Sequence, residues 1–335
     1  MSLIRVKLST SSPGWPLARQ SPGCQGIWGN CHFLIDDDTD ECDVWVVYAG
    51  LAWRQTASCP PQNTVFVDGE PPSVKGYPAR FLHQFATLVT CRRGLRHPRV
   101  IHQQQGLPWH VGRRQRGHVN IGFHLDYDEL CGIEPVKEAV LSVVCSNKAL
   151  TRGHRARLRF VERLQRRLGD RLATFGRGFR EVEDKWDAIA PFRYHLAIEN
   201  CRHADYWTEK LSDAFLGLAY PFYHGCPNLA EYFPADTYTP IDIADFDRAA
   251  DTIEAAIAEN LWERSQPALK VARELVLNRY NVFPMLAELV GRLDLNAPRQ
   301  TLTLRPEHEF LAEIRDLPRQ LVSRLQRGLL RLMVR

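Results

Sequence analysis

The chain has 335 residues with a hydrophobic fraction of 44%, and its 43 Lys and Arg against 39 Asp and Glu give a formal net charge of +4. This length suffices for two domains of ordinary size, and the apolar content excludes a disordered chain. No stretch approaches the roughly 18 consecutive apolar residues of a membrane span, and the N-terminus lacks the charged head and apolar stretch of a secretory signal.

The first part of the chain alternates short apolar runs with polar connections, which is typical of an α/β domain. We expect buried strands at residues 3–8, 44–48, 64–67 and 100–101, and a helix running into a strand over 81–89. Residues 113–118 are basic and are expected to be exposed and mobile. A linker to the second domain is expected within residues 126–137.

A pair of carboxylates follows the strand expected at residues 64–67, in the sequence DGEPP. Asp68 and Glu70 stand just past its carboxyl end, where a glycine and two prolines would hold them rigidly. Glu70 could instead cap the following turn. Further on, the polar loop QQQGLPW could line a pocket through the Gln105 amide and the Trp109 ring, or serve only as a structural loop.

The second part of the chain contains two candidate phosphate-binding turns. An apolar run at residues 139–145 leads into Ser146 and Asn147 and then into a helix expected from about residue 152 to 167. A second strand at 194–198 is followed by a polar loop, a helix capped by Asp205 or Thr208, and another strand at 219–223, which is the pattern of a βαβ unit.

The polar loop at residues 199–210 carries several kinds of functional group that could bind a ligand. In parallel sheets, ligands sit at the carboxyl ends of the strands near helix N-termini. The loop offers carboxylates, an amide, a phenol and an ammonium group there, which suits the hydroxyls and phosphates of a sugar nucleotide.

The C-terminal third of the chain is mainly helical in pattern. Helices are expected at 181–190, 228–233, 247–260, 268–280 and 282–293, a strand-like segment at 237–243 and a loop at 298–306. The last residues, 319–335, carry five arginines and no acid in an amphipathic pattern. They could lie on an anionic membrane surface or equally pack on the protein with the arginines in water.

The segment from His195 to Phe246 closely resembles the donor-binding signature of the α-1,3-fucosyltransferases, glycosyltransferase family 10. The shared residues, in order, are His195, Leu196, Ala197, Glu199, Asn200, Asp205, Tyr206, Thr208, Glu209, Lys210, Leu211, Pro221, Gly225, Tyr232, Phe233, Pro234, Asp245 and Phe246. Outside this segment, the resemblance extends to Gly69-Glu70, to Ser146-Asn147 and to an arginine three residues before Phe160, which is Arg157.

The resemblance implies a GT-B-like α/β fold, with two Rossmann-like parallel-sheet domains facing a cleft. Residues 1–135 would form an acceptor-binding domain and residues 136–265 a donor-binding domain. Residues 266–335 would form a helical C-terminal extension ending in the basic tail.

The resemblance also implies an activity, namely inverting transfer of L-fucose from GDP-fucose to a hydroxyl of a glycan or glycolipid acceptor. This hydroxyl would be the 3-hydroxyl of N-acetylglucosamine or glucose. Glu70 would be the general base that takes the proton from it, with Asp68 as the reserve. Gln105 and Trp109 would contact the acceptor.

The donor residues follow from the same resemblance. Arg157 and Lys210 would neutralise the diphosphate, with Arg155 as the alternative to Arg157. Glu199 would be catalytic, by stabilising positive charge at the anomeric carbon. The other expected donor-binding residues are Ser146, Asn147, Asn200, Tyr206, Thr208 and Glu209. Two cations would do the work of a metal clamp, so no essential metal or other cofactor is expected.

Several alternatives remain at this level. The chain could use another nucleotide sugar, or could be an inactive glycan-binding relative. Its arginine-rich stretches could bind nucleic acid, but aromatic residues are not interleaved with them, so this is not expected. The nine cysteines show no CxxC pair, which favours reduced thiols in a cytoplasmic protein, with the tail as a peripheral contact to the inner membrane surface.

Overall fold

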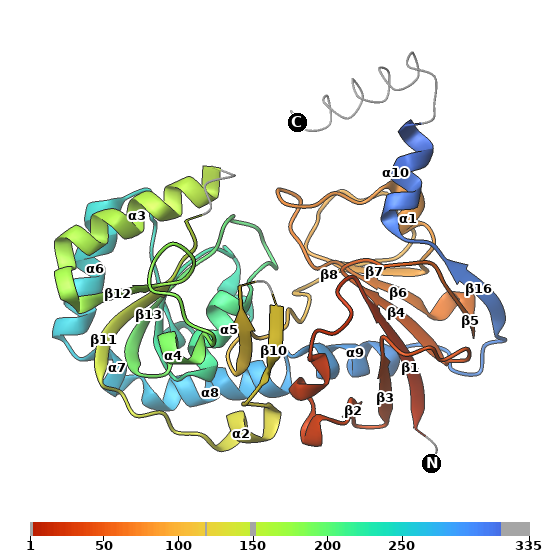
Figure 1. Cartoon of the computed structure of the whole chain (residues 1–335), viewed down its shortest axis with the longest axis horizontal. Coiled ribbons are helices and arrows are strands. Elements are labelled where there is room, and N and C mark those ends of the chain that lie inside the picture. The colour runs from red at the N-terminus through yellow and green to blue at the C-terminus, as the bar shows by residue number, and fades with distance from the viewer. Residues whose placement is uncertain (1–2, 118, 148–151, 316–335) are drawn as a thin grey trace.

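The computed structural model describes residues 3–117, 119–147 and 152–315. Two parallel sheets form two lobes, with helices covering both faces of each (Figure 1). The expected α/β fold with two Rossmann-like domains is therefore confirmed. No described helix is long and apolar enough to cross a membrane.

The first sheet has the strand order β2-β3-β1-β4-β6-β7-β8, and all its neighbours are parallel except β2 and β3. Its strands are β1 (Ile4–Thr10), β2 (Ile27–Trp28), β3 (Cys31–Ile35), β4 (Val44–Tyr48), β6 (Thr64–Val67), β7 (Thr87–Thr90) and β8 (Val100–His102). Strands β4, β6 and β7 are buried along their whole length, which agrees with sequences made of apolar residues and threonine. The strands predicted from the sequence in this region are confirmed.

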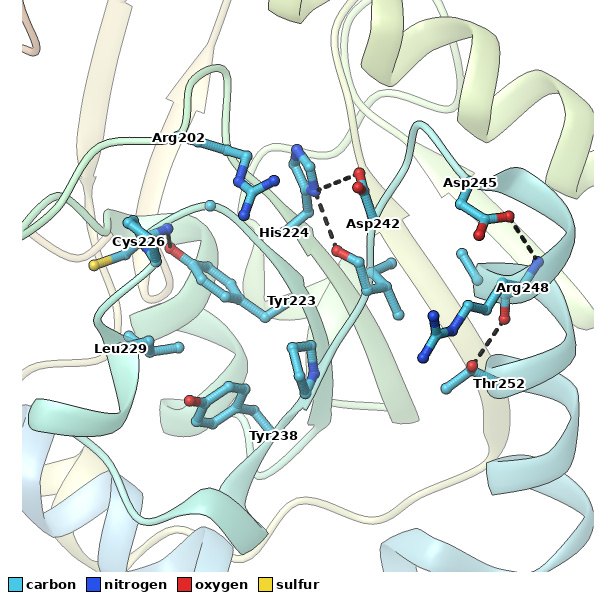
Figure 2. A pocket seen from close by; sticks show the side chains of 15 residues that line it. Arg202, Tyr223, His224, Cys226, Leu229, Tyr238, Asp242, Asp245, Arg248 and Thr252 are labelled. Atoms are coloured by element: carbon cyan, nitrogen blue, oxygen red, sulfur yellow. Dashed lines mark hydrogen bonds and ion pairs between the residues drawn. The ribbon is translucent and has the colours of Figure 1, made fainter.

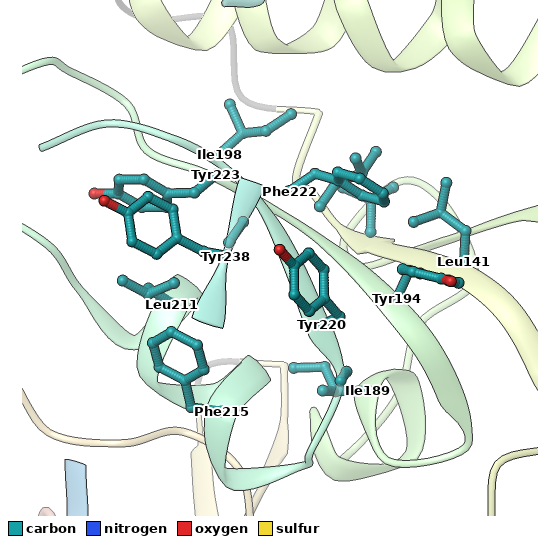
Figure 3. Packing of buried hydrophobic residues seen from close by; sticks show 14 of the residues in the cluster. Leu141, Ile189, Tyr194, Ile198, Leu211, Phe215, Tyr220, Phe222, Tyr223 and Tyr238 are labelled. Atoms are coloured by element: carbon teal, nitrogen blue, oxygen red, sulfur yellow. The ribbon is translucent and has the colours of Figure 1, made fainter. Parts of the chain in front are cut away.

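The second sheet has the order β12-β11-β13-β14-β15 and is parallel throughout. Its strands are β11 (Ala139–Val144), β12 (Leu172–Phe175), β13 (Phe192–Ile198), β14 (Tyr220–His224) and β15 (Thr239–Pro240), and its helices include α3 (Arg152–Leu168), α4 (Trp186–Ile189), α5 (Glu209–Leu216) and α6 (Phe246–Ala258). Aromatic and aliphatic side chains from β13, β14 and α5 fill its core, among them Tyr194, Phe222 and Phe215 (Figure 3).

Helix α5 begins at Thr208, whose hydroxyl accepts a hydrogen bond from the N–H of Lys210 at 3.3 Å. The alternative N-cap, Asp205, has a positive φ of 60° and lies in the preceding loop. Thr208 is therefore the cap, and the loop reaches its helix three residues later than Asp205 would have allowed.

The described residues after 265, which are 266–315, are divided between the two lobes and do not form a helical extension of their own. Helix α8 (Gln266–Asn278) packs against α5 of the second lobe, whereas α9 (Val282–Val290) enters the core of the first. Strand β16 (Gln300–Leu304) pairs antiparallel with β5 (Gln55–Cys59), so the loop predicted at 298–306 is wrong. Helix α10 (Glu307–Arg315) follows, and the predicted tail at 319–335 lies outside the described residues.

Two further segments differ from the sequence-based expectation. Residues 113–117, from the stretch expected to be an exposed and mobile basic segment, are not a free loop, because β9 (Arg113–Arg116) pairs with β10 (Val119–Phe123) in a hairpin between the lobes (Figure 1). The helix expected at 181–190 is reduced to α4, since the carboxylate of Asp184 accepts the N–H of Trp186 and starts the helix there.

Candidate active site

A cavity of about 880 Å³ opens at the carboxyl end of the second sheet. Ser146 after β11, Gly176 after β12 and Asn200 after β13 all line it. The strand order reverses between β11 and β13, and such a reversal is where ligands bind in open α/β sheets. From the first 135 residues, His110 in the preceding loop and Arg113 in the β9–β10 hairpin also line it.

A buried charge cluster forms the floor of this cavity at the start of α5. The Lys210 ammonium lies 3.3 Å from Glu199 Oε2 and 3.1 Å from Glu209 Oε1. Burial disfavours the charge on Lys210, but Glu199 and Glu209 outweigh burial and raise its pKa. Burial likewise opposes charge on Glu209, yet Lys210 and Lys185 hold its pKa well below the usual range. Lys210 and Glu209 are therefore both charged.

Glu199 is 2% exposed and does not line the cavity. Its Oε1 accepts hydrogen bonds from the Thr208 N–H at 2.8 Å and from the Thr208 hydroxyl at 2.9 Å. Burial raises the pKa of Glu199, and Lys210 opposes that rise. The expected contact between Glu199 and a sugar is not what this geometry offers, because the carboxylate is enclosed by the cap and by Lys210.

The two candidate phosphate arginines are in different environments. Arg157 is 4% exposed, lines the cavity from α3, and its Nε has no hydrogen-bond partner among the described residues. Arg155 is exposed on the same helix and does not line the cavity. Ser146 lines the cavity, whereas the neighbouring Asn147 is exposed and does not.

Asn200 lines the cavity, and its side-chain oxygen is buried without a partner among the described residues. A Cβ built at Gly153, in the first turn of α3, would overlap the backbone carbonyl oxygen of Asn200. Only glycine allows this approach, which brings the helix carrying Arg157 against the loop after β13.

We therefore expect Gly153→Ala to lower the free energy of unfolding by about 1–3 kcal/mol, since the backbone must shift to relieve the overlap. Gly132→Ala is the matched control, because a Cβ there meets nothing within 4 Å. Urea denaturation of both variants measures the difference. Equal stability of the two variants would contradict the close approach.

Glu70 is half-buried at the end of β6, while Asp68 is 2% exposed. The Asp68 carboxylate forms an ion pair with Arg92 and accepts the Thr90 hydroxyl at 2.8 Å. It also accepts the N–H of Glu70 at 3.2 Å, so Asp68 rather than Glu70 stabilises this turn. The Asp68 carboxylate is thus committed to structural contacts.

The Glu70 carboxylate is electrostatically linked to the charge cluster on the other lobe. Burial raises its pKa, Glu209 raises it further and Lys210 opposes the rise. The lobes also meet nearby, where Arg93 forms an ion pair with Asp205 and the Gln105 amide donates to the Asp205 carbonyl at 3.2 Å. The turn after β6 and the loop before α5 therefore face each other.

Trp109, Gln105, Tyr206 and Thr208 are also absent from the lining of the cavity. Trp109 is 1% exposed within the core of the second lobe, so its ring has no face left for an acceptor. Gln105 is 2% exposed and donates to backbone carbonyls. Tyr206 is also buried, and burial raises its pKa. The expectation that Trp109 and Gln105 present themselves to a ligand is corrected, because backbone groups and core residues surround them.

The cavity-lining residues that sequence reasoning missed include Lys185, Asp213, His110 and Arg113. The Lys185 ammonium lies 3.4 Å from Glu209 Oε1 and 3.7 Å from Asp213 Oδ2. Burial raises the pKa of Asp213 to about 6 and lowers that of His110 well below its ordinary value. Asp213 follows Glu209 by one helical turn, so this residue could have been found from spacing.

A second, smaller hollow of about 470 Å³ lies beside β14, β15 and the start of α6 (Figure 2). His224 contacts Asp242 and the carbonyl of Ile241 there, and the guanidinium groups of Arg202 and Arg248 stand at its edge. Within the described part of the chain, no group of three or more His, Cys, Asp or Glu residues could hold a metal ion.

The comparisons with known proteins concern the domain that holds this cavity. Residues 135–259 match the family model described as glycosyltransferase family 10 (fucosyltransferase) C-term. The second domain resembles the family 10 fucosyltransferases. The resemblance inferred from the sequence is thereby confirmed for this part of the chain.

Curated relatives match the same region. The 4-galactosyl-N-acetylglucosaminide 3-alpha-L-fucosyltransferase 9 of Mus musculus is 33% identical over 122 residues, which are 35% of this chain and 32% of that protein. The alpha-(1,3)-fucosyltransferase FucT of Helicobacter pylori is 31% identical over 74 residues, 22% of this chain and 16% of that protein. The matches thus span about a third or less of these relatives.

Among solved structures, an alpha1,3-fucosyltransferase crystallised with GDP aligns with 84% of this chain and 93% of its own, at 15% identity and a TM-score of 0.49. The crystal structure of the alpha1,3-fucosyltransferase with GDP-fucose aligns over 84% and 92%, with a TM-score of 0.47 and 15% identity.

Proposed function

We propose that the chain is an inverting glycosyltransferase that transfers L-fucose from GDP-fucose to a hydroxyl of a glycan acceptor. The observation that carries this proposal is the cavity at the strand-order reversal, where Lys210, Arg157 and Glu209 come together in the domain that resembles the fucosyltransferases. Both curated relatives are named as 3-fucosyltransferases, which supports the donor and the linkage.

The donor diphosphate would lie between Arg157 and Lys210. Arg157 contributes a buried guanidinium whose Nε has no hydrogen-bond partner among the described residues. Lys210 contributes an ammonium that stays protonated despite its burial, because Glu199 and Glu209 raise its pKa. Both cations would strengthen their hold as negative charge builds up on the departing GDP, which lowers the barrier to bond breaking. With two fixed cations at the leaving group, the reaction needs no metal clamp.

Glu199 would act through Lys210 and not on the sugar. Its enclosed carboxylate fixes the ammonium and the Thr208 cap, and so determines where the positive charge points. We therefore assign Glu199 as a positioning residue. Glu209 would accept hydrogen bonds from ribose hydroxyls, and Asn200 would use its unpartnered oxygen to hold the donor.

The acceptor hydroxyl would lose its proton to Glu70. A carboxylate of raised pKa on the opposite lobe can take this proton while the donor's anomeric bond breaks, and attack from that side inverts the configuration. The name of the mouse relative suggests an N-acetylglucosaminide as the acceptor to try first. Trp109 and Gln105 would not hold this acceptor, because both are buried.

The test is a transfer assay with GDP-fucose, GDP-mannose and UDP-glucose, each with and without a panel of N-acetylglucosamine- and glucose-containing acceptors. We expect acceptor-dependent release of GDP from GDP-fucose, and a product in which the new linkage is α by NMR. Turnover of UDP-glucose alone would refute the fucose assignment and favour the same fold with another donor. Binding of GDP-fucose without transfer to any acceptor would favour an inactive glycan-binding relative.

A further inference from the structure

The β9–β10 hairpin belongs to the first 135 residues but is fastened to the second domain. The Gln115 N–H donates to the carbonyl of Glu183 at 2.8 Å. The guanidinium groups of Arg114 and Arg116 each lie 2.7 Å from the Glu183 carboxylate. The hairpin lies between the two lobes (Figure 1), and its residues Arg113, Gln115 and Arg116 line the cavity.

Arg113, in this hairpin, was not among the site residues predicted from the sequence. It is 8% exposed and lines the cavity, and its guanidinium stacks on the ring of Trp15 at 3.9 Å. Its Nη2 donates to the side-chain oxygen of Gln115, which also lines the cavity, but among the described residues the guanidinium forms no ion pair with a carboxylate. A largely buried charge without an opposite charge in contact is costly, which is reason to expect an anionic ligand beside it.

The charge of the cavity wall agrees with an anionic ligand. The cationic lining residues are Arg113, Arg116, Arg157, Arg177, Lys185 and Lys210. The carboxylates are Glu181, Glu183, Glu209 and Asp213, so the lining carries two more positive than negative charges. The diphosphate of a sugar nucleotide has two negative charges.

We propose that Arg113 is a further diphosphate-binding residue, and that the β9–β10 hairpin forms a wall of the nucleotide site. Stacking on Trp15 holds the guanidinium in place before the ligand arrives, so little side-chain freedom is lost on binding. The inference rests on the proposed function only in taking the ligand to be a nucleoside diphosphate.

The experiment is calorimetric titration of the full chain with GDP and with UDP, on the wild type, Arg113→Gln, Arg113→Lys and Arg264→Gln. A hydrogen bond to a charged group contributes enough that Arg113→Gln should bind the diphosphate about tenfold or more weakly. Arg113→Lys keeps the charge and should recover part of the affinity. Arg264→Gln is the matched control, since Arg264 is exposed, lies outside the hairpin, is absent from the cavity lining and should leave the affinity unchanged.

A second measurement follows the hairpin directly. Hydrogen exchange of the amides of residues 113–117 and 119–123 should slow when GDP is added to the wild type, even if Arg113→Gln folds poorly. Equal affinity of Arg113→Gln and the wild type, or unchanged hairpin exchange in GDP-saturated protein, would overturn the inference and leave the proposed function standing. Binding of UDP but not GDP would refute the proposed donor, and the Arg113 series would then be judged with UDP.

Discussion

Replacing Lys210 with alanine is expected to abolish measurable binding of GDP and GDP-fucose. The ammonium is buried between two carboxylates, and removing one partner of a buried pair costs about 3–5 kcal/mol because the other charge is left uncompensated. In the variant, Glu199 and Glu209 would repel the diphosphate that Lys210 attracts. Calorimetry should show affinity reduced by at least about two orders of magnitude, at about 1.4 kcal/mol per tenfold change.

The same substitution should also destabilise the fold in a pH-dependent way. Burial already raises the pKa of Glu199, and loss of Lys210 removes the main influence that opposes this rise. An acid with a raised pKa in the folded state binds protons more tightly when folded, so Lys210→Ala should regain stability relative to the wild type as the pH falls through the Glu199 pKa. Urea denaturation at several pH values measures this.

Two comparisons separate the binding defect from the stability defect. Lys270→Ala removes an exposed ammonium paired with Glu134 at 2.9 Å, and should change neither property. The double variant Glu199→Gln/Lys210→Met carries no uncompensated charge at this pair and should recover much of the stability without recovering GDP binding. Recovery of binding in the double variant would show that Lys210 does not contact the ligand.

The strands of both sheets could be predicted from the sequence, because parallel strands that are buried on both faces consist of short, mainly apolar runs. Residues 44–48 and 64–67 are recognisable for that reason, and both became fully buried strands. The carboxyl ends of the strands at 64–67 and 139–144 were also predictable, and this placed Glu70 and Ser146 at the correct edges of their sheets. Local patterns thus gave the parts of the site that lie on one strand end or one helix start.

Contacts between segments far apart in the chain could not be predicted in this way. Nothing in the sequence near Arg113 indicates that β9 and β10 pair, or that Trp15 supports the guanidinium from almost a hundred residues away. The same limit explains the error at Trp109, since a tryptophan in a polar loop has the same sequence pattern whether it is buried or exposed. Its burial depends on the core of the other domain.

Replacing Glu70 with glutamine is expected to abolish transfer while leaving the donor bound. Glutamine has nearly the same shape but cannot take a proton, and loss of a general base costs about 10²–10⁴-fold in rate. The Glu70 side chain lies on the first lobe, across from the residues that would bind the diphosphate. The affinity for GDP-fucose should therefore stay within about twofold of the wild-type value, which is a change in binding free energy well below the roughly 1.4 kcal/mol of a tenfold change. Steady-state kinetics and calorimetry measure the two quantities separately.

The pH dependence provides an independent check on the same residue. The base acts when ionised, so kcat/KM should fall tenfold per pH unit below the Glu70 pKa and level off above it. Burial and the neighbouring Glu209 raise this pKa above the ordinary value of 4.5, against the opposing effect of Lys210, and the acidic limb should lie correspondingly higher. The substitution Glu209→Gln removes a negative charge that raises the pKa of Glu70, so the acidic limb of the kcat/KM profile should move to lower pH.

Asp68→Asn is the matched control for Glu70→Gln, because the two carboxylates are two residues apart but differ in their contacts. Asp68 is held by Arg92 and Thr90, so its substitution should lower the free energy of unfolding and leave transfer by the folded fraction intact. If Asp68→Asn lost transfer at unchanged stability while Glu70→Gln kept it, Asp68 would be the base. The contacts of Asp68 argue against that outcome, since its carboxylate is 2% exposed and its oxygens already contact Arg92 and Thr90.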